Sequence, residues 1–395
     1  MAEPLEQPRD GAGMSGAVRG RCPGALRPMA AADGLLLRIR PPGSRLTQAQ
    51  ARGLADLAWA HGSGIVELGS RAHLQLRGLH EADLGPVRGA LAELGLLDRD
   101  AGIEARRNIL VTPLWQGAAV PRLAAALGRM LARAPELPAK FGLAVDAGPV
   151  AVLGTASADL RIERGAGGGL ILRADGMDRG EPVTAAAAPG RVLALLHWFA
   201  AARGEHRRMA ALVAAGARPP LLAAEAPATG PALLPGPVPG GFCLGLPFGR
   251  IPAPVLGALA TAPLRLTPWR SLVIEGATAA PALPGLIADP ADPLLRVAAC
   301  TGAPGCPHAG AQTRALARRL AVLVPPGRLL HVSGCAKGCA HPRAADLALT
   351  ARAGRFDLIP DGTPAGAPAR RSLDPADIPE FVSAHFQRGR LAPYL

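Results

Sequence analysis

Four cysteines near the C-terminus have the spacing of a metal-ligand set. Cys300 and Cys306 form a C-x5-C pair, and Cys335 and Cys339 form a C-x3-C pair. Four thiolates that converge on one point can hold a cubane iron–sulfur cluster or a tetrahedral zinc ion. Zinc sites favour tight C-x2-C pairs, so the wider loops favour the larger cluster. Glycines in and beside both pairs allow the backbone to wrap closely around an inorganic core; they are Gly302, Gly305, Gly334 and Gly338.

Two other interpretations of these cysteines stay open. After the cluster, a zinc site ranks second, and disulfides or unrelated buried thiols rank third. Residues 1–20 are polar and Gly-rich, without the apolar core of a secretory signal, and a cytosolic chain rarely keeps disulfides. We therefore predict a cytoplasmic protein. Cys22 and Cys243 stand alone, and we predict that they are structural, because free cysteine often packs as a small buried hydrophobe.

The composition narrows the class of partner. The chain has 395 residues, of which 49% are hydrophobic, so two or three domains with a sizeable core are expected. A net charge of +13 is typical of nucleic-acid-binding proteins. Here, however, the basic residues are mostly single arginines, with no Lys/Arg run and no aromatic-interleaved patch. We expect a small molecule with many carboxylates and no nucleic acid. No segment has the apolar length needed to cross a membrane.

Hydrophobic periodicity predicts a series of strands and helices that occurs twice. The predicted elements are strands at 33–40, 64–68 and 73–76 with helices at 47–61 and 86–97, then strands at 241–248, 264–267 and 271–276 with a helix at 254–261. Segments 66–78 and 264–276 both read as a strand, a turn with an arginine, a strand and a glycine. This shared order indicates a duplication.

A second α/β segment lies between the two copies. It has predicted strands at 158–164 and 170–173 and a predicted helix at 192–203, and an Ala/Pro-rich linker follows at 217–240. The glycines from Gly165 to Gly169 do not make a dinucleotide site, because Leu170 stands where G-x-G-x-x-G needs its last glycine. We predict a hairpin turn there. A last helix is predicted at 313–323, between the two cysteine pairs.

The duplication and the cysteine quartet together resemble the nitrite/sulfite reductase superfamily, and within it the precorrin-3B synthase family of aerobic cobalamin biosynthesis. The similarity runs from about Cys22 to Cys339 and beyond. The strings that carry it are RCPG at 21–24, PM at 28–29, DGL at 33–35, CTGAPGCP at 300–307 and HVSGCAKGCAHP at 331–342.

The resemblance implies an α+β fold of two pseudo-symmetric halves. Each half would have a ferredoxin-like half-domain and an α/β domain of the type that binds sirohaem or a cluster. The domains that we predict are a disordered tail at 1–20, a half-domain at 21–98, an α/β domain at 99–216, the linker at 217–240, a second half-domain at 241–292 and a cluster-binding α/β domain at 293–395.

The resemblance also implies cofactors. A 4Fe–4S cluster would lie on Cys300, Cys306, Cys335 and Cys339, and Cys339 could also bridge to, or be an axial ligand of, a sirohaem-type iron. A mononuclear iron is the alternative to sirohaem. Lys337 lies between two ligands, where its charge could tune the cluster potential. His308 and His341 could be neighbours of the cluster or plain surface residues, and both readings stay open.

Three basic residues match positions at which these reductases bind the tetrapyrrole. Arg71 matches the arginine of a T-x-R-Q-like turn, Arg107 that of an R-N motif, and Lys140 the first lysine of K-x-K. The second lysine is Gly142, a change that would weaken sulfite chemistry, which needs several cations, and would enlarge the pocket. We predict structural roles for the other basic residues nearby, namely Arg38, Arg40, His73 and Arg77.

The family's activity gives the expected function. The resemblance implies an oxygen- and NADH-dependent monooxygenase that hydroxylates precorrin-3A at C20 and closes a γ-lactone. The chain has no nucleotide-binding fold of its own, so the electrons of NADH would come through a reductase partner. Two alternatives remain: a sirohaem-dependent assimilatory sulfite or nitrite reductase, and a non-catalytic metal-stabilised binding protein.

Overall fold

The computed structural model of the protein describes residues 23–388. The predicted tail at 1–20 and Cys22 lie outside these residues. No helix in the described part of the chain has both the length and the apolar character needed to cross a membrane.

The first half of the chain forms a half-domain and then an α/β domain. The half-domain contains β1 (Met29–Ala31), β2 (Gly34–Ile39), the 3-10 turn η1 (Pro42–Ser44), β3 (Arg45–Leu46), α1 (Gln48–His61), β4 (Ile65–Leu68), β5 (Leu74–Leu79), η2 (Glu81–Asp83) and α2 (Leu84–Glu93). The α/β part contains α3 (Ala101–Arg106), β6 (Ile109–Val111), α4 (Ala119–Met130), η3 (Leu131–Arg133), β7 (Leu143–Asp146), β8 (Leu160–Arg164), β9 (Leu170–Ala174), β10 (Glu181–Pro182), α5 (Ala188–Ala202) and α6 (Met209–Ala214).

The second half repeats the order of the strands. Its half-domain contains β11 (Gly236–Val238), β12 (Gly241–Gly245), η4 (Pro247–Gly249), β13 (Arg250–Pro252), α7 (Ala253–Leu259), β14 (Leu264–Leu266) and β15 (Ser271–Glu275). Its α/β domain contains η5 (Pro293–Arg296), β16 (Val297–Ala299), α8 (Arg314–Leu320), η6 (Ala321–Leu323), β17 (Leu330–Ser333), β18 (Ala345–Arg352), β19 (Arg355–Gly362), β20 (Arg370–Leu373) and α9 (Ile378–Arg388).

The two half-domains exchange a strand. The first sheet has the order β1-β2-β5-β4-β13 and the second has the order β11-β12-β15-β14-β3. Strand β13 of the second half therefore pairs with β4 of the first, and β3 of the first pairs with β14 of the second. Helices α1 and α7 also pack on each other, and both contribute to one buried core. Each sheet is completed only by the other half, so we expect the two half-domains to fold as one unit.

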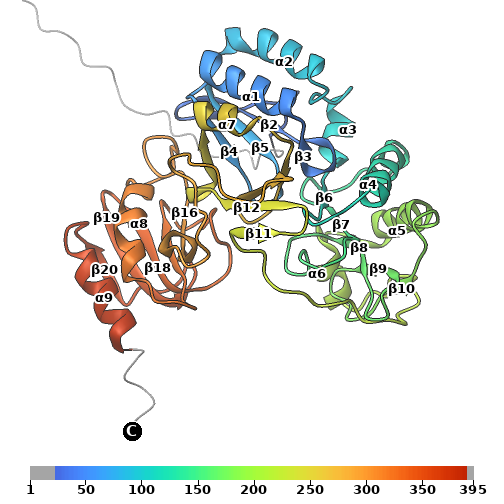
Figure 1. Ribbon diagram of the computed structural model, residues 1–395. Helices are drawn as coiled ribbons and strands as arrows, with labels where there is room; N and C mark the ends of the chain where they lie inside the picture. The colour runs from blue at the N-terminus through green and yellow to red at the C-terminus, as the bar shows by residue number, and fades with distance from the viewer. Residues whose placement is uncertain (1–22, 389–395) are drawn as a thin grey trace, which may run out of the picture.

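The two α/β domains share one topology. Strands β6, β7 and β8 are parallel, and β9 and β10 continue the sheet antiparallel. In the second half β16, β17 and β18 are parallel, followed by antiparallel β19 and β20. Figure 1 shows the paired half-domains at the top, the first α/β domain at lower right and the second at lower left. The carboxyl ends of parallel strands meet at one edge of a sheet, where ligand sites of such sheets are commonly found.

Most predicted elements occur, with different ends. The helix predicted at 86–97 is α2, which ends at Glu93 because Gly95 takes a left-handed φ of 66°. The helix predicted at 192–203 is α5, which begins at Ala188 with a proline in its first turn. The strand predicted at 241–248 stops at Gly245, because Pro247 opens the turn η4. The glycines after β8 form the predicted hairpin turn, in which Gly165 N donates to Gly169 O at 2.9 Å.

Candidate functional site

Both cysteine pairs lie in loops at one edge of the second α/β sheet. Cys300 directly follows β16, and Cys335 follows β17, which is parallel to β16. The two loops touch, because the backbone N–H of Gly334 donates to Cys300 Sγ at 3.1 Å. A Cβ on Gly334 would lie 2.7 Å from Ala309 Cβ and 3.4 Å from the Cys300 sulfur. Only glycine allows this close approach of the second loop to the first.

The four thiols are electrostatic neighbours. Partial burial is the main cause that raises the pKa of Cys339 above its ordinary value. The thiols of Cys300, Cys335 and Cys306 raise this pKa further, whereas the Lys337 ammonium lowers it. Cys339 is nevertheless the most exposed residue of the quartet; the other three are half-buried. The cysteines predicted as ligands thus affect one another electrostatically, and the Lys337 ammonium acts on Cys339.

Thiols in two adjoining loops are the donors that a thiolate-bound metal group would use. Within residues 23–388, no three Cys, His, Asp or Glu side chains lie close enough together to hold one metal ion. Tetrahedral zinc has Zn–S distances of about 2.3 Å, which would bring its sulfurs closely together. In a cubane each cysteine binds a different iron, so the sulfurs stay further apart. Gly302 and Gly338 take left-handed backbone conformations, and a backbone N–H donates to Cys300 Sγ; hydrogen bonds of this kind tune the potential of a thiolate-bound cluster.

Two arginines from the half-domains hold the cysteine loops. Arg77 of β5 donates from Nη2 to the carbonyl oxygen of Gly305 at 2.7 Å, in the first loop. Arg270, in the turn between β14 and β15, donates to the carbonyl oxygen of Ala340, next to Cys339, also at 2.7 Å. Sequence reasoning gave Arg77 a structural role and noted Arg270 only as part of the repeat. Their contacts could not be predicted, because they join residues far apart in the chain.

A second group of basic residues gathers around His73. In β5 and just before it, Leu74 and Leu76 are buried in the core under α1, so His73, Gln75 and Arg77 point to the opposite face of the sheet. His73 is buried, and its pKa is well below the ordinary histidine value. Burial is the main cause, and four cationic neighbours add to it: Arg40, Arg38, Arg71 and Arg107. His73 is therefore neutral at pH 7, within a strongly positive region.

The three predicted tetrapyrrole residues have different surroundings. Arg71 is half-buried in the turn between β4 and β5, and Arg107 follows α3; both act on His73. Arg107 already has an acidic partner, because its Nε and Nη2 donate to the two carboxylate oxygens of Asp98 at 2.7 and 2.8 Å. Lys140 is exposed on the turn before β7. The structure thus brings Arg71 and Arg107 into one region and gives no contact that joins Lys140 to them.

Gly142 does not leave a hole where the second lysine was expected. A Cβ at this buried position would lie 2.7 Å from Asn108 Nδ2, and Asn108 donates to the carbonyl oxygen of Phe141 at 3.0 Å. The backbone N–H of Gly142 donates to Asp159 at 2.9 Å. The expectation that this change enlarges the pocket is therefore wrong, because the Asn108 side chain fills the space.

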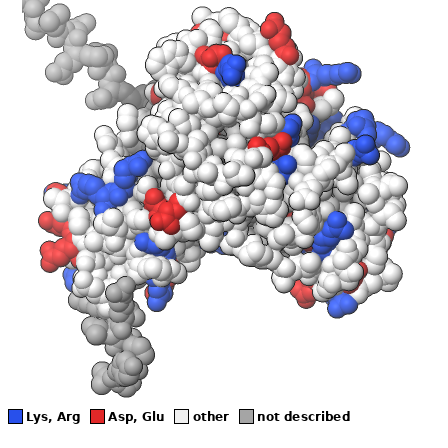
Figure 2. Space-filling view, in the orientation of Figure 1, with Lys and Arg blue, Asp and Glu red and all other residues white. Residues whose placement is uncertain are grey.

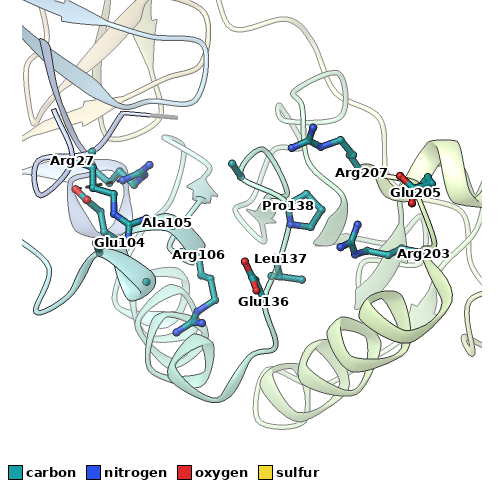
Figure 3. A pocket seen from close by; sticks show the side chains of 15 residues that line it. Arg27, Glu104, Ala105, Arg106, Glu136, Leu137, Pro138, Arg203, Glu205 and Arg207 are labelled. Carbon is teal, nitrogen blue, oxygen red and sulfur yellow. Dashed lines mark ion pairs between the residues drawn. The ribbon is translucent and has the colours of Figure 1, made fainter. Parts of the chain in front are cut away.

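An arginine-rich pocket of about 660 Å³ opens between the first half-domain and the first α/β domain. In Figure 3, Arg27, Glu104 and Arg106 lie on one side, Arg203, Glu205 and Arg207 lie on the other, and Glu136 to Pro138 lie between them. Ala139, the neighbour of Lys140, also lines it. Its volume is within the usual range of ligand pockets, about 300–1,000 Å³. Sequence reasoning missed these arginines; the close spacing of Arg203, Glu205 and Arg207 after a helix was the available signal.

Helix α3 separates this pocket from a second one of about 700 Å³. Gly102, Ala105 and Arg106 face the first pocket, whereas Ile103 and Arg107, one helical turn apart, face the second. Figure 2 shows Lys and Arg side chains gathered over α3 and α4, at the upper right of this face. Helix α3, whose residues line both pockets, therefore lies in a basic part of the face shown.

Comparisons with known proteins agree with this architecture. Residues 27–94 match the nitrite/sulfite reductase ferredoxin-like half domain. The chain is 29% identical to a precorrin-3B synthase from a Sinorhizobium species, over 89% of this chain and 84% of that protein. Its structure resembles that of the Mycobacterium tuberculosis NirA protein, with a TM-score of 0.62 and 18% identity over 88% of this chain and 79% of the other. The expected resemblance and the expected nitrite/sulfite reductase-like α+β fold are confirmed.

Proposed function

We propose that this chain, a protein of nitrite/sulfite reductase-like fold with similarity to a precorrin-3B synthase, is itself an oxidoreductase of that type: a monooxygenase of cobalamin biosynthesis, acting in the cytoplasm. The observation that carries the proposal is that the two cysteine loops follow the parallel strands β16 and β17, touch at Gly334 and Cys300, and are each held by a half-domain arginine. The similarity over 89% of the chain supports it.

The cysteines would hold a 4Fe–4S cluster. Cys300, Cys306, Cys335 and Cys339 are the proposed ligands, and Cys339, the exposed one, is the proposed link to a sirohaem or a mononuclear iron. When bound, a cluster supplies electrons one at a time. The chain's own contribution is to position the loops through Arg77 and Arg270 and to offset thiolate charge with Lys337.

The arginines would bind the substrate's carboxylates. Precorrin-3A, the proposed substrate, carries many acetate and propionate side chains, and guanidinium groups bind carboxylates with two parallel hydrogen bonds. Arg71 and Lys140 are proposed as contacts, together with the pocket arginines of Figure 3. We propose that Arg107 makes fewer hydrogen bonds to the substrate, because two of its N–H donors already bond to Asp98.

The proposed reaction balances as a monooxygenation. One atom of dioxygen becomes the C20 hydroxyl of the product, the other leaves as water, and the ring A acetate closes the γ-lactone. Two electrons and two protons are consumed, and NADH would supply the electrons through a reductase partner.

Two measurements test this proposal. Anaerobically purified protein should contain iron and acid-labile sulfide, and with precorrin-3A, a reductant and labelled dioxygen it should give a product heavier by one labelled oxygen atom. Absence of iron and sulfide, or an unchanged tetrapyrrole, would overturn the proposal.

A sirohaem-dependent sulfite or nitrite reductase is the second candidate, favoured by the match of residues 27–94 to the nitrite/sulfite reductase ferredoxin-like half domain. Strong Soret and visible bands of a sirohaem, together with rapid turnover of sulfite or nitrite, would establish it in place of the monooxygenase.

A further inference from the structure

The two halves of the chain contain the same unusual turn. In each half-domain a Pro-initiated 3-10 turn follows the second strand, at Pro42–Ser44 and Pro247–Gly249. The middle residue takes a left-handed backbone conformation in both, with φ of 65° at Gly43 and 57° at Phe248. Gly43 and Phe248 are therefore equivalent positions in the duplication.

In the second half the Phe248 side chain fills the space beneath this turn. It belongs to the buried core that contains Val297 of β16 and Leu316 of α8. The guanidinium carbon of Arg318, also in α8, lies 5.7 Å from the centre of the Phe248 ring. An aromatic ring and a cation thus occupy the junction of turn, strand and helix.

In the first half the same junction has lost both side chains. Gly43 stands at the position equivalent to Phe248. Helices α4 and α8 each end in a 3-10 turn, η3 and η6, and when they are aligned on these turns Gly128 is equivalent to Arg318. A Cβ added to Gly43 or to Gly128 would meet no atom within 4 Å. The space is open, and it is part of the 700 Å³ pocket on the far side of α3.

The open pocket combines apolar walls with cations. Ile109, Val111 and Trp115 line it. Arg40 also lines it and is 5% exposed; its Nη1 lies 3.5 Å from Glu104 Oε1 and its Nη2 donates to the carbonyl oxygen of Pro23, whereas Nε and Nη1 have no hydrogen-bond acceptor within residues 23–388. Buried donors without partners are costly, by roughly 1–3 kcal/mol each, so an acceptor in the pocket would be stabilised. The exposed Arg129 also lines the pocket and makes no ion pair within the described residues.

We propose that this pocket binds a small planar aromatic anion, such as an aryl carboxylate of one or two rings. The ring would lie where the Phe248 ring lies in the other half, and the carboxylate would meet Arg40 or Arg129. The duplication sets the size of the proposed ligand, because the phenyl ring of Phe248 and the side chain of Arg318 occupy the equivalent space in the second half. Helix α3 lies between this site and the first pocket; Arg40 lines both pockets, and Arg107 also lines this one. The proposed anion site depends on the residues of this pocket alone.

The probe for this site is 2-naphthoate, measured by isothermal titration calorimetry on the full chain. The wild-type protein should bind 2-naphthoate and should bind the neutral 2-naphthylmethanol at least about tenfold more weakly. Gly43→Phe should lower the naphthoate affinity at least about tenfold, because the introduced ring occupies the site. The left-handed conformation accepts phenylalanine, as Phe248 shows. Gly128→Arg should also lower the naphthoate affinity, because the arginine side chain fills the other part of the pocket.

Two control variants separate blocking from strain and from added charge. Gly43→Ala carries the left-handed strain without a ring and should bind within about twofold of wild type. Gly89→Arg adds the same charge at an exposed glycine of α2, also with open space around its Cβ, and should leave binding unchanged. The proposal is overturned if wild type does not bind naphthoate, or if folded Gly43→Phe and Gly128→Arg variants bind it as tightly as wild type. If Gly43→Phe does not fold, Gly128→Arg decides alone.

Discussion

Arg77 donates a hydrogen bond from Nη2 to the carbonyl oxygen of Gly305 at 2.7 Å, so a strand of the first half-domain holds the first cysteine loop. Two further bonds to Asp33, of 2.8 and 2.9 Å, fix the guanidinium. Arg77→Gln removes this brace. We expect the fold to persist and, if the proposed 4Fe–4S cluster is bound, its brown absorbance to bleach several times faster in air, because a loosened loop would expose the cluster.

The control for Arg77 is Arg355→Gln, which breaks an ion pair of 3.8 Å between half-exposed side chains in the second α/β domain. That variant should bleach at the wild-type rate. Equal rates in all three proteins would show that the Arg77–Gly305 bond does not protect the cluster.

Single Cys→Ser changes test the ligand set. Replacement of Cys300, Cys306, Cys335 or Cys339 should remove most of the cluster absorbance and iron, because one corner of the cubane loses its ligand. Cys243→Ser is the matched control: burial raises the pKa of the Cys243 thiol to about 11, so it stays an inert thiol at pH 8. Iron content and absorbance measure the outcome, and a variant of the quartet with full iron content would remove that residue from the set.

The sequence predicts the local features of this protein well. Period-two and helical patterns locate most strands and helices, and the paired cysteines indicate a common site, because these signals are short-range or have a fixed spacing. The exchange of β3 and β13 between the half-domains is not predictable in this way, since nothing within a two- or three-residue strand states which sheet it joins.

The roles of single basic residues are the least predictable part of the site. Arg71 and Arg107 both match family positions, yet only the structure shows that Asp98 binds Arg107 and that Arg77 braces a cysteine loop. Such partners lie elsewhere in the chain. Likewise, the loss of a lysine at Gly142 suggested added space, whereas the Asn108 side chain, more than thirty residues earlier, fills it.

His73 gives a pH dependence of stability. Burial and four nearby arginines hold the pKa of folded His73 well below that of an unfolded histidine, about 6.5. As pH falls below about 6.5, the unfolded chain binds a proton that the folded chain does not, so the free energy of unfolding decreases. His73→Gln lacks this proton uptake. As pH falls from 7 to 5, the free energy of unfolding in urea should therefore decrease less in His73→Gln than in wild type. An equal decrease in both proteins would contradict a buried neutral histidine.

Arg71→Ala and Arg107→Ala should differ in what they change. Arg107→Ala breaks the two-bond pair with Asp98 and should lower the free energy of unfolding by about 2 kcal/mol, because hydrogen bonds to charged groups are worth roughly 1.5–3 kcal/mol. Arg71→Ala should chiefly lower tetrapyrrole affinity, on the order of tenfold to a hundredfold. Urea unfolding and a binding titration on both variants measure this, and Arg107→Ala with wild-type stability would show that the Asp98 pair contributes little.

Gly142→Lys tests why this chain lacks the second lysine of the K-x-K pattern found in the reductases that it resembles. The new Cβ would lie 2.7 Å from Asn108 Nδ2, at a buried position whose N–H already bonds to Asp159. Overpacking of this kind typically costs about 1–3 kcal/mol. We expect that loss of stability in urea unfolding, and no gain of sulfite turnover. Ala139→Lys, three residues earlier on the wall of the pocket, adds the same side chain in open surroundings and should be tolerated.

The double variant Asn108→Ala/Gly142→Lys identifies the cause. If the Asn108 side chain occupies the lysine's space, its removal should recover part of the lost stability, and the two substitutions should couple by about 0.5–3 kcal/mol in a double-mutant cycle. If the two effects are additive, the loss of stability in Gly142→Lys would come instead from disruption of the hydrogen bond between Gly142 N–H and Asp159. Recovery would mean that one asparagine, packed against one glycine, keeps this position closed to a cation, and that the difference from the reductases here lies in packing and not in an enlarged pocket.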